Sequence, residues 1–284
     1  MSAPQQILTL SCTDTIGIVA AVSNFLADRG DFIVESQQFA DLGTGRFFMR
    51  VAYLPADDDA ERARADFAPV AARFGMDWAL HDTRQRMRIV IAVSRFGHCL
   101  NDLLHRWRNG TLPVEIAAIV SNHDDFRSLA EWHGLPFLHQ PVTAATRAVQ
   151  EADLLSIIAE HQVDLLVLAR YMQILSPDLC DALNGRCINI HHSFLPSFRG
   201  AKPYSQAHAR GVKLIGATAH FVTRDLDEGP IIEQGVERVD HATDAAAMVT
   251  AGQDVESLVL ARAVTWAAER RILLNGTKTV VFRR

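Results

Sequence analysis

The chain of 284 residues predicts an α/β protein built from two domains. In the first eighty residues, segments with strand and helix periodicity follow one another in the order βαββαβ. Charged and polar residues then cluster at 82–86, as at a domain boundary. Beyond this cluster the strand-like runs are apolar on both faces, which is typical of parallel strands covered by helices. We therefore expect a small domain over residues 1–83 and a doubly wound, mostly parallel sheet over residues 87–284.

The first domain opens with an alternating strand and an amphipathic helix. Ile7 to Cys12 places alternate side chains on one face, as a half-buried strand requires. Asp14 or Thr15 can cap the helix that follows, and Gly30 is placed to end it. The expected inner face of this helix consists of Val19, Val22, Phe25 and Leu26.

Two strands, a second helix and a short last strand complete the first domain. The two strands cover Phe32 to Ala40 and Arg46 to Leu54 and are joined by a glycine-bearing hairpin loop. An Ala- and Arg-rich helix follows from about Ala60, and the acidic run before it suits the positive end of a helix dipole. Asp77 to His81 is the expected last strand.

The second domain contains apolar runs that alternate with helical stretches. Arg88 to Ser94, Val114 to Ser121 and Leu165 to Ala169 are the clearest of these runs. Because open parallel sheets bind ligands beyond the carboxyl ends of their strands, we expect the functional site at that edge of the sheet.

The composition excludes several classes of protein. The net charge of −5 does not provide the clustered Lys and Arg of a nucleic-acid-binding surface. No run approaches the roughly 18 consecutive apolar residues of a membrane span, and the first residues do not resemble a secretory signal. The four cysteines form no C-x-x-C pair and are interpreted as buried thiols in a reducing compartment. We expect a cytoplasmic protein.

One apolar strand ends in a pair of residues suited to acyl chemistry. Asn189 and His191 are two positions apart, so their side chains project to the same face of the strand. An amide N–H can bind a developing oxyanion, and a histidine can hold or transfer a proton. On these residues alone, the simpler interpretation that both only form hydrogen bonds in a turn remains open.

A second stretch places a carboxylate after another strand. Ala217 to Val222 leads into a polar loop with Asp225, Asp227 and Glu228, and a carboxylate there could orient a nucleophile or stabilise an imidazolium on His191. A metal site formed by His191, His192 and His220 is the alternative, because histidine is a common metal ligand. Adjacent histidines on a strand face opposite ways and no spaced ligand set is present, so we expect no metal.

Three separated motifs resemble those of the folate-dependent formyltransferases. Asn189-Ile-His191, followed by Ser193-Phe-Leu-Pro196, resembles their signature, and His220 to Pro230 resembles the loop that supplies their catalytic aspartate. Leu168 to Ser176 resembles the segment that lines their folate pocket.

Longer strings resemble the formyltetrahydrofolate deformylases in particular. These strings are His191 to Phe198, Gly211 to Ala217 and, in the first domain, Thr44 to Arg50. The resemblance spans nearly the whole chain, and its motifs occur in the right order.

The resemblance implies roles for individual residues. Asn189 would hold the formyl oxygen, His191 would stabilise the tetrahedral intermediate and pass a proton, and Asp227 would position the water and assist its deprotonation. Gln173 stands where many transferases have an arginine that contacts the cofactor's tail. The residues implied to contact the folate are Met172, Gln173, Ile174, Leu175, Thr223 and Arg224.

The first domain resembles an ACT domain of ferredoxin-like βαββαβ order, a module that often dimerises and binds small amino acids. The usual D-R-x-G opening of this module is Asp14, Thr15, Ile16 and Gly17 here, with Thr15 in place of the arginine. The resemblance implies a homodimer or homotetramer and a small amino-acid effector such as glycine at this turn.

The implied activity is hydrolysis of 10-formyltetrahydrofolate to tetrahydrofolate and formate, which feeds formate to purine and one-carbon metabolism, with no cofactor and no metal. The glycinamide ribonucleotide formyltransferases cradle a substrate phosphate in a Gly-rich first βα turn, whereas Val93 to Cys99 has one glycine and the bulky Phe96. Without an amine acceptor, the formyl group would go to water. Formyl transfer to an amine, or a non-catalytic sensor of amino acids and folate, remain the alternatives.

Overall fold

Contacts divide the chain into two units, which are described separately. The computed structural model describes residues 4–195 and 203–283. One unit consists of the residues up to Arg86 together with 270–275 and the chain from Val280 onward, and the other consists of residues 87–269 and 276–279. None of the helices in the described part of the chain is long and apolar enough to cross a membrane.

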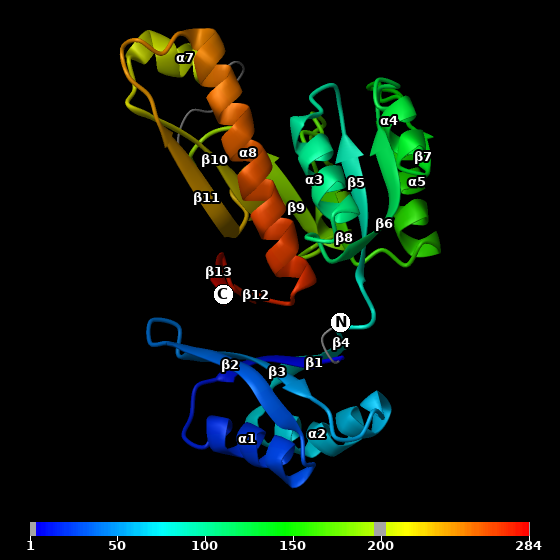
Figure 1. The fold of residues 1–284 in the computed structure, drawn as a ribbon, viewed down its shortest axis with the longest axis vertical. Helices are drawn as coiled ribbons and strands as arrows, with labels where there is room; N and C mark the ends of the chain where they lie inside the picture. The colour runs from blue at the N-terminus through cyan, green and yellow to red at the C-terminus, as the bar shows by residue number, and fades with distance from the viewer. Residues whose placement is uncertain (1–3, 196–202, 284) are drawn as a thin grey trace. The chain divides into compact units, whose positions relative to one another are not determined.

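The N-terminal unit is a four-stranded antiparallel sheet with two helices (Figure 1). The strands lie in the order β2-β3-β1-β4, so that β2 is an edge strand. The elements are β1 Gln6–Thr13, α1 Ile18–Asp28, β2 Phe32–Asp41, β3 Arg46–Leu54, α2 Ala60–Phe74 and β4 Asp77–Asp82. Their order is the predicted βαββαβ.

The start of α1 differs from the prediction. The N-cap is Gly17, at φ 98°, and no side chain caps the helix, so neither Asp14 nor Thr15 has the expected capping role. Glycine adopts this left-handed conformation without a Cβ clash and allows the chain to enter the helix from an exposed turn. As a result the helix face is shifted: Ile18, Val22 and Leu26 are buried, whereas Val19 is exposed.

The C-terminal tail corrects the expectation that all residues from 87 to 284 belong to the second domain. Strands β12 (Ile272–Asn275) and β13 (Lys278–Val281) form a hairpin, most of which groups with the N-terminal unit. The buried Arg271 donates to both carboxylate oxygens of Glu35 at 3.1 and 3.0 Å. Val280 and Phe282 belong to the same buried cluster as Phe48 of β3.

The second unit is built on a seven-stranded sheet in the order β11-β10-β9-β8-β5-β6-β7 (Figure 1). The strands from β9 to β7 are parallel, and β10 and β11 are added antiparallel at one side. This arrangement confirms the predicted α/β class with a mostly parallel sheet. The strands are β5 Met87–Val93, β6 Val114–Ser121, β7 Phe137–His139, β8 Leu165–Leu168, β9 Cys187–His191, β10 Leu214–Phe221 and β11 Ile231–Arg238.

Helices cover this sheet and bury its apolar strands. The long α8 packs against β9, β10, β11 and α3, and its N-cap Asp244 accepts a hydrogen bond from the Ala247 N–H at 2.8 Å. The chain order reverses between β5 and β8, because β6 and β7 follow on one side of β5 and β8 lies on the other. Such a reversal leaves a crevice beyond the carboxyl ends of the two strands. The helices are α3 His98–Arg108, α4 Arg127–Trp132, α5 Arg147–Glu160, α6 Pro177–Ala182, α7 Pro203–Arg210 and α8 Ala245–Ala268.

Candidate active site

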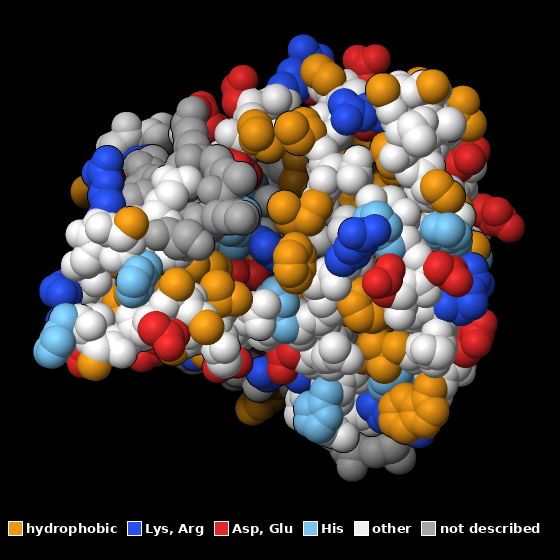
Figure 2. Space-filling model, turned by 90° about the horizontal axis from the view of Figure 1, so that it is seen from above, with side chains coloured by type: hydrophobic (Ala, Val, Ile, Leu, Met, Phe, Trp, Pro, Cys, Tyr) orange, Lys and Arg blue, Asp and Glu red, His pale blue; other side chains and the backbone are white. Residues whose placement is uncertain are grey.

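A pocket of about 790 Å³ lies at the carboxyl ends of β5, β8 and β9, where the sheet order predicts a crevice. Figure 2 looks onto the edge toward which β5 and β6 point in Figure 1, and histidine, acidic, basic and hydrophobic side chains gather in the middle of this face. All the predicted catalytic and folate-contacting residues line the pocket: Met172, Gln173, Ile174, Leu175, Asn189, His191, Thr223, Arg224 and Asp227. The motif residues 196–198 lie outside the described residues.

Asn189 is oriented by a histidine from the neighbouring strand. The antiparallel pairing of β9 with β10 sets Asn189 directly opposite His220. The Nδ1 atom of His220 lies 2.9 Å from the carbonyl oxygen of Phe221, which can only accept, so Nδ1 carries the proton. With the proton on Nδ1, the Nε2 atom carries the lone pair and accepts from the Asn189 amide at 3.3 Å. The second amide N–H of Asn189 has no acceptor among the described residues and remains for a ligand.

His191 and Asp227 form a hydrogen-bonded pair. Nδ1 of His191 lies 3.2 Å from Oδ2 of Asp227, and His191 is only 8% exposed. Its Nε2 atom is buried and has no hydrogen-bond partner in the described part of the chain. With the proton on Nδ1 donated to Asp227, the Nε2 lone pair is free to accept a proton.

The loop that carries Asp227 is held close to β10. Asp227 adopts a left-handed φ of 59°, which aspartate tolerates better than most residues. A Cβ on Gly229 would lie 1.7 Å from the Phe221 carbonyl oxygen, so only glycine lets the loop approach the strand this closely. Burial alone would raise the pKa of Asp227, but the hydrogen bond from His191, together with His220 beside the carboxylate, outweighs burial and holds the pKa well below its usual value. Asp227 is therefore an ionised acceptor throughout the neutral pH range.

One rim of the pocket is apolar, as a flat heteroaromatic ligand requires. Met172 and Ile174 are exposed at this rim, and Leu226 lies with them. Arg224 is paired with Asp181 at the surface. The predicted effector residues Asp14 to Gly17 belong to the N-terminal unit and are not part of this pocket.

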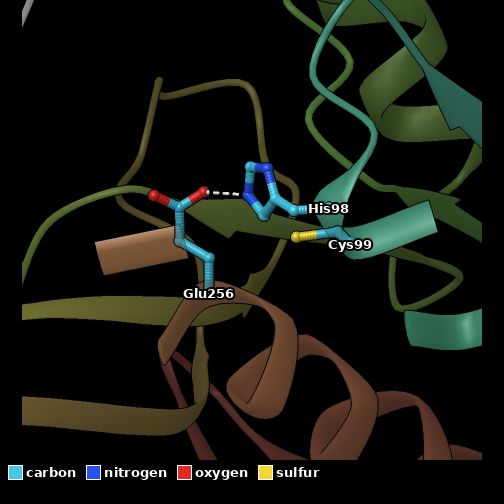
Figure 3. Close-up of side chains that lie close together, drawn as sticks. All are labelled: His98, Cys99 and Glu256. Atoms are coloured by element: carbon cyan, nitrogen blue, oxygen red, sulfur yellow. Dashed lines mark hydrogen bonds and ion pairs between the residues drawn. The ribbon is translucent and has the colours of Figure 1, made fainter. Parts of the chain in front are cut away.

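The pocket lining also contains a buried charged cluster that the sequence did not reveal. Glu256 of α8 is fully buried and accepts from Tyr204 at 2.7 Å. His98, at the start of α3, lies 2.7 Å from the other oxygen of Glu256 (Figure 3). Arg170, just beyond β8, places its Nε 3.3 Å from the same oxygen. Glu256 falls on the buried stripe of α8 with Gly252, Val259 and Leu260, and this spacing could have revealed it.

His98 and Glu256, together with the neighbouring Cys99, are a candidate set of metal ligands. The ligand atoms of His98, Cys99 and Glu256 lie within 4.8 Å of one another. However, burial and the charge of Glu256 raise the pKa of the Cys99 thiol, which opposes formation of a thiolate ligand. Arg170 also places a positive charge next to the carboxylate that the metal would need. The donor set therefore fits a cation poorly.

His192 is expected to lower the stability of the protein in mild acid. Burial, together with Arg170 and His191, lowers the pKa of His192 from 6.5 to about 4. Between these values the unfolded chain binds more protons than the folded one, so the free energy of unfolding falls as the pH falls from about 6.5 to about 4. His192→Gln removes this contribution. Between about pH 6.5 and 4, the free energy of unfolding of the variant should therefore fall by about 1–3 kcal/mol less than that of the wild type. Denaturant unfolding of both proteins at several pH values measures the difference. The two curves should run parallel between pH 7 and 8, and parallel curves at lower pH as well would contradict the burial argument.

Comparisons with known proteins agree with this geometry. Residues 87–264 match the model of the formyl transferase family. A formyltetrahydrofolate deformylase of Corynebacterium sp. (strain P-1) is 50% identical over 281 residues, which cover 98% of each chain. The crystal structure of a formyltetrahydrofolate deformylase from Burkholderia mallei is 54% identical, has a TM-score of 0.95 and covers 98% of this chain and 99% of its own.

A transferase of the same fold is more distant. Glycinamide ribonucleotide transformylase 1 from Symbiobacterium toebii is 30% identical, with a TM-score of 0.65 over 70% of this chain and 95% of its own. The similarity to the deformylases extends over both units of the chain, whereas the transformylase corresponds to part of it. The chain belongs to the formyltetrahydrofolate deformylase family.

Proposed function

We propose that the protein hydrolyses 10-formyltetrahydrofolate to tetrahydrofolate and formate, and so supplies formate to one-carbon metabolism and purine synthesis. The observation that carries this proposal is the buried His191, which lines the pocket together with Asn189 and is hydrogen-bonded to the ionised Asp227. Its Nε2 atom has no hydrogen-bond partner among the described residues. The names of the relatives support the substrate.

The geometry supports a hydrolytic sequence in which each residue has one task. Water adds to the formyl carbon, and its proton passes to Nε2 of His191, whose ring Asp227 orients through the bond to Nδ1. The free N–H of Asn189 stabilises the oxyanion that develops on the formyl oxygen. The oxyanion then reforms the C=O bond and the C–N bond breaks as His191 returns the proton to N10, which leaves tetrahydrofolate and formic acid. Formic acid loses its proton to solvent and becomes formate.

The first βα turn supports water rather than an amine as the acceptor. The Phe96 ring lies against the guanidinium of Arg170, with its ring centre 5.5 Å from the Arg170 Cζ atom. His98 is hydrogen-bonded to Glu256. Side chains thus occupy the start of α3, where a phosphate-binding loop would present bare N–H groups. Formyl transfer to an amine is the competing function, because the transformylases share the fold.

The purified full-length protein should release stoichiometric formate from 10-formyltetrahydrofolate. We expect the rate to be unchanged by EDTA, because the described donor set fits a cation poorly. Glycinamide ribonucleotide should remain unformylated when it is added. A rate that is lost in EDTA and restored by one divalent metal would contradict the metal-free proposal, and formylated amine would establish the transferase instead.

Substitutions in the site should lower turnover strongly. Asn189→Ala should lower kcat by about 10²–10³, the effect of losing one oxyanion donor. His191→Ala and Asp227→Asn should cost at least as much, and the double variant should be far from additive because the two residues act as a unit. His220→Ala should act through Asn189 and lower kcat with little change in KM. The exposed Asn184→Ala is the control. Near wild-type turnover in all site variants would refute the assignment.

We also propose that the N-terminal unit is an ACT-like module through which the protein forms a homodimer or homotetramer. The βαββαβ order and the sheet order β2-β3-β1-β4 support it. Its edge strand β2 exposes apolar side chains, with Phe32 66% exposed. Exposed apolar edges favour pairing between copies of a chain.

The same module would bind a small amino acid such as glycine at the turn from Asp14 to Gly17. This turn precedes α1, whose first N–H groups are not capped by a side chain, and Ile16 within it is 98% exposed. An amino-acid carboxylate suits such N–H groups. The amino acid would change the affinity for the folate by a certain factor, and the folate would change the affinity for the amino acid by the same factor.

Charges placed on the edge strand should reduce the size of the particle. We expect Phe32→Glu/Val34→Glu to lower the mass measured by light scattering, because the buried edge would then hold like charges. Val149→Glu, at an equally exposed valine of α5, is the matched control. Point variants are preferable to deletion of residues 1–81, because the C-terminal hairpin would lose its partners. An unchanged mass would contradict the interface, and a flat activity profile across a panel of amino acids would contradict the effector.

A further inference from the structure

Arg170 is held in an unusual backbone conformation at the pocket wall. It lies two residues beyond the end of β8 and has a left-handed φ of 64°, a region that favours glycine. Residues other than glycine persist in such conformations when the surrounding structure holds them there, often at functional sites. Two hydrogen bonds with Ser94 fix this segment. The Ser94 N–H donates to the Arg170 carbonyl oxygen at 3.2 Å, and the Met172 N–H donates to Ser94 Oγ at 3.0 Å.

The guanidinium of Arg170 has no hydrogen-bond acceptor among the described residues, and its Nε is buried. Arg170 is 9% exposed and lines the pocket. Its Nε lies near Glu256, but it makes no hydrogen bond, and the described residues provide no acceptor for its remaining N–H groups. The two oxygens of Glu256 are instead bonded to Tyr204 and His98. Glu256 therefore balances the charge of Arg170 and leaves its donors unused.

Buried donors without acceptors are costly, and in a binding pocket they indicate a missing ligand. The guanidinium is a planar fork of N–H groups that matches the two oxygens of a carboxylate. Glu256 is oriented toward its other donors, so the matching carboxylate must come from a ligand in the pocket.

We propose that Arg170 forms a carboxylate subsite in the pocket that His191 and Asp227 also line. The inference rests on the proposed function, because the reaction produces a carboxylate, formate, within the same pocket. The glutamate of the folate is the other possible source of a carboxylate. If formate is the ligand, Arg170 captures the product after the C–N bond breaks, and added formate inhibits the enzyme.

The aromatic ring below Arg170 strengthens this site. The Phe96 ring lies against one side of the guanidinium, in a cation–π contact with Cζ 5.5 Å from the ring centre. His192 lines the same pocket and is neutral above about pH 4, so it adds no competing positive charge. Arg170 thus provides a fixed positive charge beside the carboxylate of Glu256.

Formate binding to the full-length protein tests the proposal without turnover. Sodium formate is titrated by calorimetry against sodium chloride of equal ionic strength, and a failure of catalysis would leave this measurement intact. Arg170→Gln should weaken formate binding by about tenfold or more, the scale of a lost charge-assisted pair. Arg170→Lys should bind with intermediate affinity because it keeps the charge and loses the fork. Arg95→Gln, an exposed arginine of the neighbouring turn that does not line the pocket, should bind formate as the wild type does.

Two further measurements separate the sources and exclude a purely structural role. The first measurement uses 10-formyltetrahydropteroate, a substrate without the glutamate. If formate is the ligand, Arg170→Gln should change KM for this substrate by the same factor as KM for the complete folate. A KM increase confined to the glutamate-bearing folate, with formate binding unchanged, would assign the subsite to the folate tail. Glu256→Gln should bind formate more tightly, because the charge opposing the anion is removed. Equal loss of formate binding in Glu256→Gln and Arg170→Gln, or wild-type binding and KM in Arg170→Gln, would overturn the proposal.

Discussion

The antiparallel pairing of β10 with β9 is the constraint on which the pocket depends. All strands from β9 to β7 are parallel, so their carboxyl ends alone would provide only loops at one edge. β10 enters from that edge and sets His220 opposite Asn189. This single pairing fixes the Asn189 amide. It also starts the loop from which Asp227 reaches His191.

The loop after β10 can reach His191 only because two positions accept unusual backbone geometry. The backbone of Asp227 has a left-handed φ, and at Gly229 a Cβ would clash with the backbone of Phe221. A strained backbone persists only where the surrounding structure holds it. Here the carboxylate of Asp227 lies beside His191 and His220. The hydrogen bond from His191 helps to keep the carboxylate ionised, so the backbone and the electrostatics of this loop support each other.

Sequence reasoning succeeded where the signal is local and failed where the partners are distant. The sequence predicts that the side chains of Asn189 and His191 share a face, because period-two alternation at a strand end places them there. It does not predict the contact of Arg271 with Glu35, because the two residues are more than two hundred positions apart and neither shows a local pattern. Periodicity placed α1 correctly, but its cap was misassigned because a left-handed glycine competes with aspartate and threonine at helix starts.

The pocket contains two carboxylates with opposite uses. Asp227 accepts from Nδ1 of His191, so that the imidazole Nε2 becomes the free and reactive atom. Glu256 is satisfied by Tyr204 and His98, so that the guanidinium of Arg170 keeps its donors. A neutral formyl group needs the His191–Asp227 pair, since its carbon must be attacked by water activated at a base. The anion that the reaction creates is repelled by Asp227 and can pair with the guanidinium donors of Arg170, so the change of charge along the reaction itself favours movement of the product away from the catalytic base.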